Sequence, residues 1–257
     1  MKKNETVQFL FTPEFMTACN LAEYAGSITG INGISVTFTK TFHEFSRCDA
    51  RVNVANKNIY LPILSYTDQL DDSSFRILKA LLCHECAHLL FPDMSFFQTT
   101  NDSQKQWLNR KLSQLIDDLR VELLLGMEYP EFRMDFKFLI DLIWMENYAI
   151  PPVEEADMGY GRFGNFSWDL MNSLYWLMQR CYRGASLVPP SACKDLLPFI
   201  PFYGIEKVFE KKIVPVLDPF VFSRDPSREA AEKIMDVLIK YYSHYFIENV
   251  YFEGRSG

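Results

Sequence analysis

The segment His84-Glu85-Cys86-Ala87-His88 carries the residues of this chain that are best suited to chemistry. It is an H-E-x-x-H motif inside an apolar run, a pattern that favours a helix. Residues four apart in a helix lie one turn above each other, so His84 and His88 share a face. Two imidazoles at this separation predict a Zn²⁺ site, and Glu85 beside the open metal position predicts a general base for hydrolysis. The alternative is two core histidines on a buried helix that binds no metal.

A catalytic zinc usually has three protein ligands, and the following segment could supply the third. Apolar residues recur at helical spacing over residues 102–126, which predicts a second helix. Asp118 and Glu122 share a face of that helix, whereas Asp117 is turned away by about 100°. We expect one carboxylate of the pair to bind the metal and the other to orient a ligand histidine. The alternative is a solvated charged face with Arg120 as its counter-ion.

Together the two segments resemble the metallopeptidase-like domain of CobT-like proteins. The resemblance rests on H-E-x-x-H, on Ile116-Asp117-Asp118-Leu119-Arg120-Val121-Glu122, which is similar to the family's I-E-D-x-R-x-E, and on the approach from Ala50 to Pro62. It covers residues 45–130, and Asp117 departs from the family's Glu. The same region occurs in von Willebrand factor A-type proteins that partner MoxR-type AAA+ ATPases, and CobT-like proteins are also encoded by phages.

The resemblance implies a zinc-dependent metallopeptidase that cleaves a peptide or protein substrate, with Glu85 as the general base. The order of acids in gluzincin-type enzymes implies that Asp118 binds zinc and that Glu122 holds His84. The reverse assignment stays open, because zinc accepts either carboxylate. The alternative function is a non-catalytic zinc-binding adaptor domain of a CobT-like chelatase or of a complex with an AAA+ ATPase. Glu85 favours the enzyme, since a structural zinc site is normally closed by four protein ligands and needs no base.

The composition limits the partners and the location. The chain has 257 residues and a net charge of −7, which argues against binding nucleic acid or an anionic membrane through bulk charge. No stretch approaches the roughly eighteen apolar residues of a membrane span. The six cysteines show no disulfide-scaffold spacing, which predicts a reducing, cytoplasmic location, the host cytoplasm if the protein is phage-encoded.

The patterning predicts an α+β fold that is mostly helical. We expect residues 1–130 to form a zincin-like metal-binding core, with a small sheet before the H-E-x-x-H helix, and residues 131–247 to form a helical subdomain packed on it. Residues 248–257 resemble a protease site used to remove affinity tags and are expected to be a cloning remnant. In the first part of the chain, the predicted elements are a helix from Pro13, a strand within residues 30–39, and strands 51–55 and 58–63 joined by a turn at Asn56-Lys57. The motif helix is expected between Asp71 and Pro92, and the next helix is expected to end at Gly126. Further helices are predicted over residues 136–148, 167–182 and 225–246, and irregular packing over residues 189–219.

Overall fold

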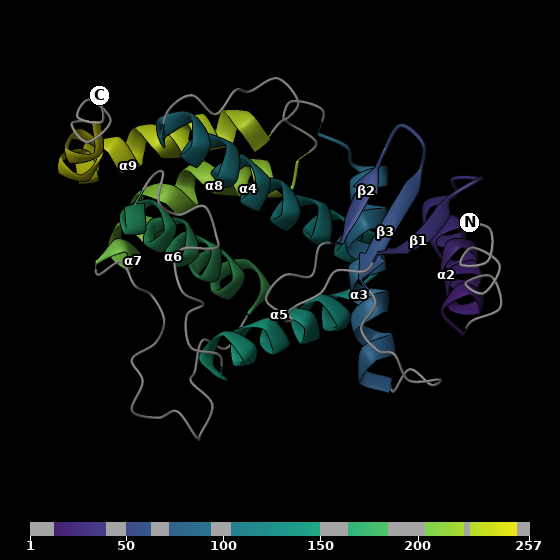
Figure 1. Ribbon diagram of the computed structural model, residues 1–257. Helices are drawn as coiled ribbons and strands as arrows, with labels where there is room; N and C mark the ends of the chain where they lie inside the picture. The colour runs from purple at the N-terminus through teal and green to yellow at the C-terminus, as the bar shows by residue number, and fades with distance from the viewer. Residues whose placement is uncertain are drawn as a thin grey trace, which may run out of the picture. The chain divides into compact units, whose positions relative to one another are not determined.

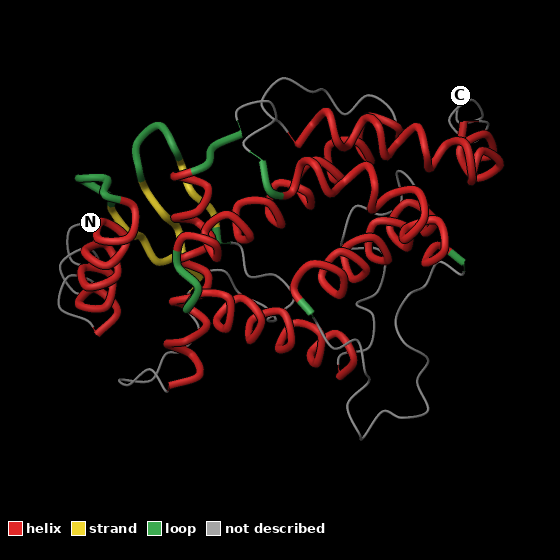
Figure 2. The backbone as a smooth tube through the Cα atoms, turned by 180° about the vertical axis from the view of Figure 1, so that it is seen from behind, coloured by secondary structure: helices red, strands yellow, loops and turns green. Residues whose placement is uncertain are grey.

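The structure is a computed structural model that describes residues 13–39, 50–62, 72–93, 104–149, 164–184, 204–223 and 227–250. Its contacts group into two compact units. The first unit comprises residues 1–92 and 125–139, and the second comprises residues 93–124 and 140–257. The described residues confirm a mostly helical α+β fold with a small sheet before the motif helix and helices after it (Figure 2). The predicted division of the chain at residue 130 stays a prediction.

The first unit is built around a three-stranded sheet (Figure 1). Its strands are β1 (Ser35–Thr39), β2 (Arg51–Asn53) and β3 (Asn58–Pro62), in the order β1-β3-β2. β1 runs parallel to β3, and β2 runs antiparallel to it. Helix α2 (Pro13–Thr29) contacts β1, and helix α3 (Asp72–Leu90), which carries the H-E-x-x-H motif, contacts β2 and β3. The motif helix therefore lies directly against the sheet.

Alternation along the strands gives the sheet one apolar face and one polar face. Val36 of β1 and Val52 of β2 both pair with Ile59 of the central strand, and Phe38 pairs with Leu61. Because side chains alternate along a strand, these five apolar residues point to the same face. Ile59 and Leu61 are fully buried, so the register places this face in the core of the first unit.

The connection between β2 and β3 is longer than the predicted two-residue turn. Asn53 accepts hydrogen bonds through Oδ1 from the main-chain N–H groups of Ala55 and Asn56. This arrangement bends the chain and ends the strand early, because Asn side chains compete with strand pairing for main-chain donors. The predicted extension of β2 to Ala55 is therefore wrong. Within this connection Lys57 has a positive φ of 55°.

Charged side chains fix the motif helix within the first unit. Asp135 of α5 (Phe132–Ala149) accepts from Arg76 Nε at 3.1 Å through one oxygen and pairs with Lys79 Nζ at 3.0 Å through the other. Both cations project from α3. Two cations on one buried carboxylate tie the motif helix to the first turn of α5.

Helix α4 (Gln104–Glu128) is one continuous helix that contributes to both units. The predicted stop at Gly126 is wrong by two residues. The carbonyl of Gly126 accepts a hydrogen bond of 2.7 Å from Arg133 Nε, and Tyr129 N–H bonds to the carbonyl of Leu125 at 2.8 Å. These hydrogen bonds supply partners for carbonyl groups that would otherwise lack one near the end of a helix. The helix therefore continues past the glycine.

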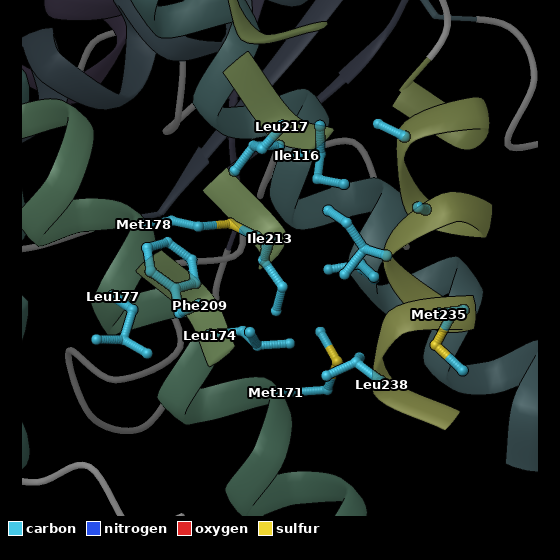
Figure 3. Packing of buried hydrophobic residues seen from close by; sticks show 14 of the residues in the cluster. Ile116, Met171, Leu174, Leu177, Met178, Phe209, Ile213, Leu217, Met235 and Leu238 are labelled. Carbon is cyan, nitrogen blue, oxygen red and sulfur yellow. The ribbon is translucent and has the colours of Figure 1, made fainter. Parts of the chain in front are cut away.

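The second unit is a helical bundle around one apolar core (Figure 3). The predicted irregular packing is wrong over residues 205–219, which are helical. Pro215 is the second residue of α8 and follows η6 directly, and Pro219 lies inside α8. The tail residues 248–250 continue the last helix, and residues 251–257 lie outside the described part. Besides α4, the helices are α6 (Gly164–Arg183), α7 (Ile205–Val208), the π-helix η6 (Phe209–Ile213), α8 (Val214–Val221) and α9 (Ser227–Val250).

None of the helices in the described ranges combines the length and apolar character that crossing a membrane requires.

Candidate metal centre

The two histidines of the motif meet on one side of α3. Their Nε2 atoms lie 3.2 Å apart, and their rings are 4.8 Å apart at an interplanar angle of 78°. Both side chains are half-buried, whereas Cys83, Cys86 and Ala87 on the same turns are fully buried. The apolar neighbours hold α3 in the core of the first unit, and the imidazoles stand at the margin of that core.

The spacing of the two imidazoles fits a shared zinc ion. Ligand nitrogens in a tetrahedral zinc site lie about 2.0–2.1 Å from the metal, which separates two of them by about 3.3 Å. The observed 3.2 Å between His84 Nε2 and His88 Nε2 agrees with this value. Without a metal, the same distance suits one hydrogen bond in which one ring donates to the other. The pair is thus arranged to share either a proton or a metal ion.

Cys83, Glu85 and Cys86, which neighbour His84 on the motif helix, are all buried. Glu85 is 4 % exposed. Burial raises the pKa of Cys86 strongly, and the charges of Cys83 and Glu85 raise it further. The Cys86 thiol is therefore protonated at neutral pH, and it is turned about 200° away from His84 around the helix. A side chain turned this far around the helix does not reach a metal ion held between the two imidazoles.

In the second unit, Asp117 is engaged by an arginine of its own helix. Arg120 donates to Asp117 Oδ1 from Nη2 at 2.6 Å and from Nε at 3.1 Å, and both side chains are buried. The alternative of a solvated charged face is therefore wrong for these two residues. Arg120 is a counter-ion as that alternative supposed, but it neutralises Asp117 inside the bundle.

Glu122 and Asp118 lie on one face of α4, and α6 supplies their partner. Arg183 Nη1 forms an ion pair of 2.5 Å with Glu122 Oε2, and its Nη2 donates to the main-chain carbonyl of Asp118 at 3.3 Å. Glu122 is 7 % exposed and the Arg183 side chain 9 %. One guanidinium thus spans a full turn of α4 at the segment that carries both acids.

The charges of Glu122 and Asp118 also affect the pKa values of other residues in the second unit. Burial raises the pKa of Tyr175 on α6, and the charge of Arg183 opposes this shift while those of Glu122 and Asp118 add to it. Burial lowers the pKa of Lys111, and the charge of Asp118 opposes that shift. Asp118, which is half-buried, therefore stands in a region where charges interact through partly excluded solvent.

The sequence predicted five site residues, and the structure distributes them over the two units. His84, Glu85 and His88 lie on α3 in the first unit, and Asp118 and Glu122 lie on α4 in the second. Sequence analysis missed Arg183 and Tyr175. Arg183 lies in the last turn of an amphipathic helix, where a cation suits the helix dipole, but this position does not predict which acid it would pair with. The sequence around Tyr175 carries no such signal.

Comparison of the chain with protein-family models, with curated proteins and with solved structures finds no match.

Proposed function

We propose that this chain is a zinc-dependent metallopeptidase-like domain that hydrolyses peptide bonds. The observation that carries the proposal is the 3.2 Å separation of His84 Nε2 and His88 Nε2 on consecutive turns of α3, which matches two nitrogen ligands of one tetrahedral ion. The zincin-like core would consist of the three-stranded sheet and the motif helix that contacts it.

Asp118 is the proposed third ligand. His84, His88 and Asp118 offer two imidazoles and a carboxylate, a ligand set that could hold a metal ion. Three protein ligands leave the fourth position of a catalytic zinc open. The other acids of the segment support this choice, because Asp117 is paired with Arg120 and Glu122 with Arg183. The reverse assignment, with Glu122 as ligand, would require the loss of a buried ion pair.

When bound, a zinc ion supplies Lewis acidity, which lowers the pKa of a water and polarises a carbonyl. Glu85 would accept the proton of the attacking water and deliver it to the leaving amine. Glu85 is nearly inaccessible to bulk water, and charges interact more strongly where solvent is excluded.

The sheet supports a peptide as the substrate. Within the described sheet β2 is an edge strand, and its outer side presents main-chain donors and acceptors with which an extended chain can pair. An extended peptide bound along β2 would run beside the helix that carries the motif, since α3 contacts β2. The AAA+ ATPase partner stays a prediction of the family resemblance.

The experiment compares zinc-loaded wild type with Glu85→Gln on a mixed peptide library, with cleavage products identified by mass spectrometry. We expect cleavage to fall at least a hundredfold in Glu85→Gln, because general bases contribute about 10²–10⁴-fold, while the zinc content stays unchanged. The matched control is Glu128→Gln, the same substitution at an exposed position of α4, which should cleave as the wild type does. Zinc bound without cleavage in any of the proteins would refute the peptidase and favour the adaptor domain.

A further inference from the structure

We propose that Arg183 is a positioning residue. It holds Glu122 in an ion pair, so that Glu122 does not bind the metal, and it orients the turn of α4 from which Asp118 binds the metal. The inference rests on the proposed function, since it assigns roles toward the same zinc ion. It is carried by contacts within the second unit, between the last turn of α6 and the acidic segment of α4.

The geometry of Arg183 is that of a clamp across one helical turn. Its two terminal nitrogens bind different residues, Nη1 the Glu122 carboxylate at 2.5 Å and Nη2 the Asp118 carbonyl at 3.3 Å. In an α-helix that carbonyl also accepts the N–H of residue 122, and a carbonyl oxygen can accept two bonds. Arg183 therefore fixes both the side chain at the end of this turn and the main chain at its start.

The burial of the pair makes the clamp strong and selective. The side chains of Glu122 and Arg183 are both more than nine-tenths buried, so neither charge can exchange its partner for water at low cost. The planar fork of arginine suits two acceptors held in fixed positions. Asp118, four residues before Glu122 on the same face, accepts a hydrogen bond from the same guanidinium at its main-chain carbonyl.

The consequence is a division of roles between two competing carboxylates. Asp118 and Glu122 are like charges one turn apart, which oppose each other on a helix unless a cation compensates. Neutralising Glu122 removes this repulsion and one rival ligand. The ion then keeps two neutral imidazoles and one carboxylate, so it retains a net positive charge and an open position.

The test is Arg183→Met, read through zinc affinity in a competition with a chromophoric chelator and through the visible spectrum of the Co²⁺-loaded protein. We expect zinc affinity to fall about 10–100-fold, the usual loss when a group that orients a ligand is removed. We also expect the released Glu122 to reach the metal, so that the intense four-coordinate Co²⁺ spectrum weakens toward a five-coordinate one. Arg183→Met/Glu122→Gln should restore the four-coordinate spectrum, an effect that a merely structural role of Arg183 would not produce.

The control and the second variant keep the test decisive. Arg180→Met makes the same substitution at an exposed position one turn earlier on α6 and should leave affinity and spectrum unchanged. If Arg183→Met does not fold, Glu122→Gln alone answers the question, because it should keep the metal and the spectrum while Asp118→Asn loses both. Metal loss in Glu122→Gln, or a wild-type spectrum and affinity in Arg183→Met, would overturn the role of Arg183 but leave the zinc site standing. No metal in the wild type would overturn the proposed function, and this inference with it.

Discussion

Asp117 is the acid of the α4 segment that we assign to stability alone, and its removal gives the sharpest test of that assignment. Asp117→Ala would leave the Arg120 guanidinium, which is 2 % exposed and donates to Asp117 from two nitrogens, without its counter-charge inside the bundle. Breaking a buried pair on one side costs about 3–5 kcal/mol, because an uncompensated charge stays buried. For a domain of this size each kcal/mol lowers the melting temperature by about 2–4 °C, so we expect a fall of about 6–20 °C.

The assay is thermal and urea unfolding followed by circular dichroism, with two comparisons. Asp117→Ala/Arg120→Met removes both charges and should recover part of the loss, since no charge is then left buried. Glu232→Ala breaks the exposed ion pair with Arg228 on α9 and should cost less than about 0.5 kcal/mol. A loss in Asp117→Ala as small as that in Glu232→Ala would refute the assignment of Asp117 to the stability of the bundle.

Two further predictions follow from pKa shifts. Burial, and the hydrogen bond of 2.5 Å that Tyr182 donates to Asp218, raise the pKa of this phenol, so its contribution to stability is complete below pH about 10 and is lost as the pH rises further. The stability advantage of wild type over Tyr182→Phe should therefore stay constant from pH 8 to about pH 10 and shrink from there to pH 11 in thermal unfolding, and no change above pH 10 would contradict the shift. The raised pKa of Cys86 and its full burial predict that Cys86→Ser does not change the fast phase of labelling by Ellman's reagent at pH 8. Cys19→Ser should reduce that phase, because Cys19 is exposed.

The elements that position the motif could be predicted because their signals are local. Pro13 marks the first turn of α2, where its fixed φ suits a helix. The alternation of β1 and β3 encodes a buried face, which the register confirms. The apolar run around His84 predicted α3, and the spacing of His84 and His88 predicted their approach, which the structure confirms.

The parts that were mispredicted depend on contacts that the sequence pattern does not carry. Proline frequency suggested irregular chain over residues 205–219, but Ile213 and Leu217 are fully buried in the bundle, and this packing outweighs the local preference. The partner of Glu122 comes from another helix, so no spacing rule within α4 could have named Arg183. The helical spacing along α4 predicted that Asp117 and Asp118 face different directions. In the structure Asp117 pairs with Arg120.

The central claim is that His84 and His88 bind one metal ion, and elemental analysis tests it most directly. Wild type, His88→Ala and Cys86→Ala would be purified without added metal, supplied with zinc and freed of excess. We predict about one zinc per chain in wild type and in Cys86→Ala, the control for a lost buried side chain on the same helical turn, and almost none in His88→Ala, since one imidazole and one carboxylate hold zinc too weakly. Wild type without zinc, or His88→Ala with as much zinc as wild type, would contradict the account.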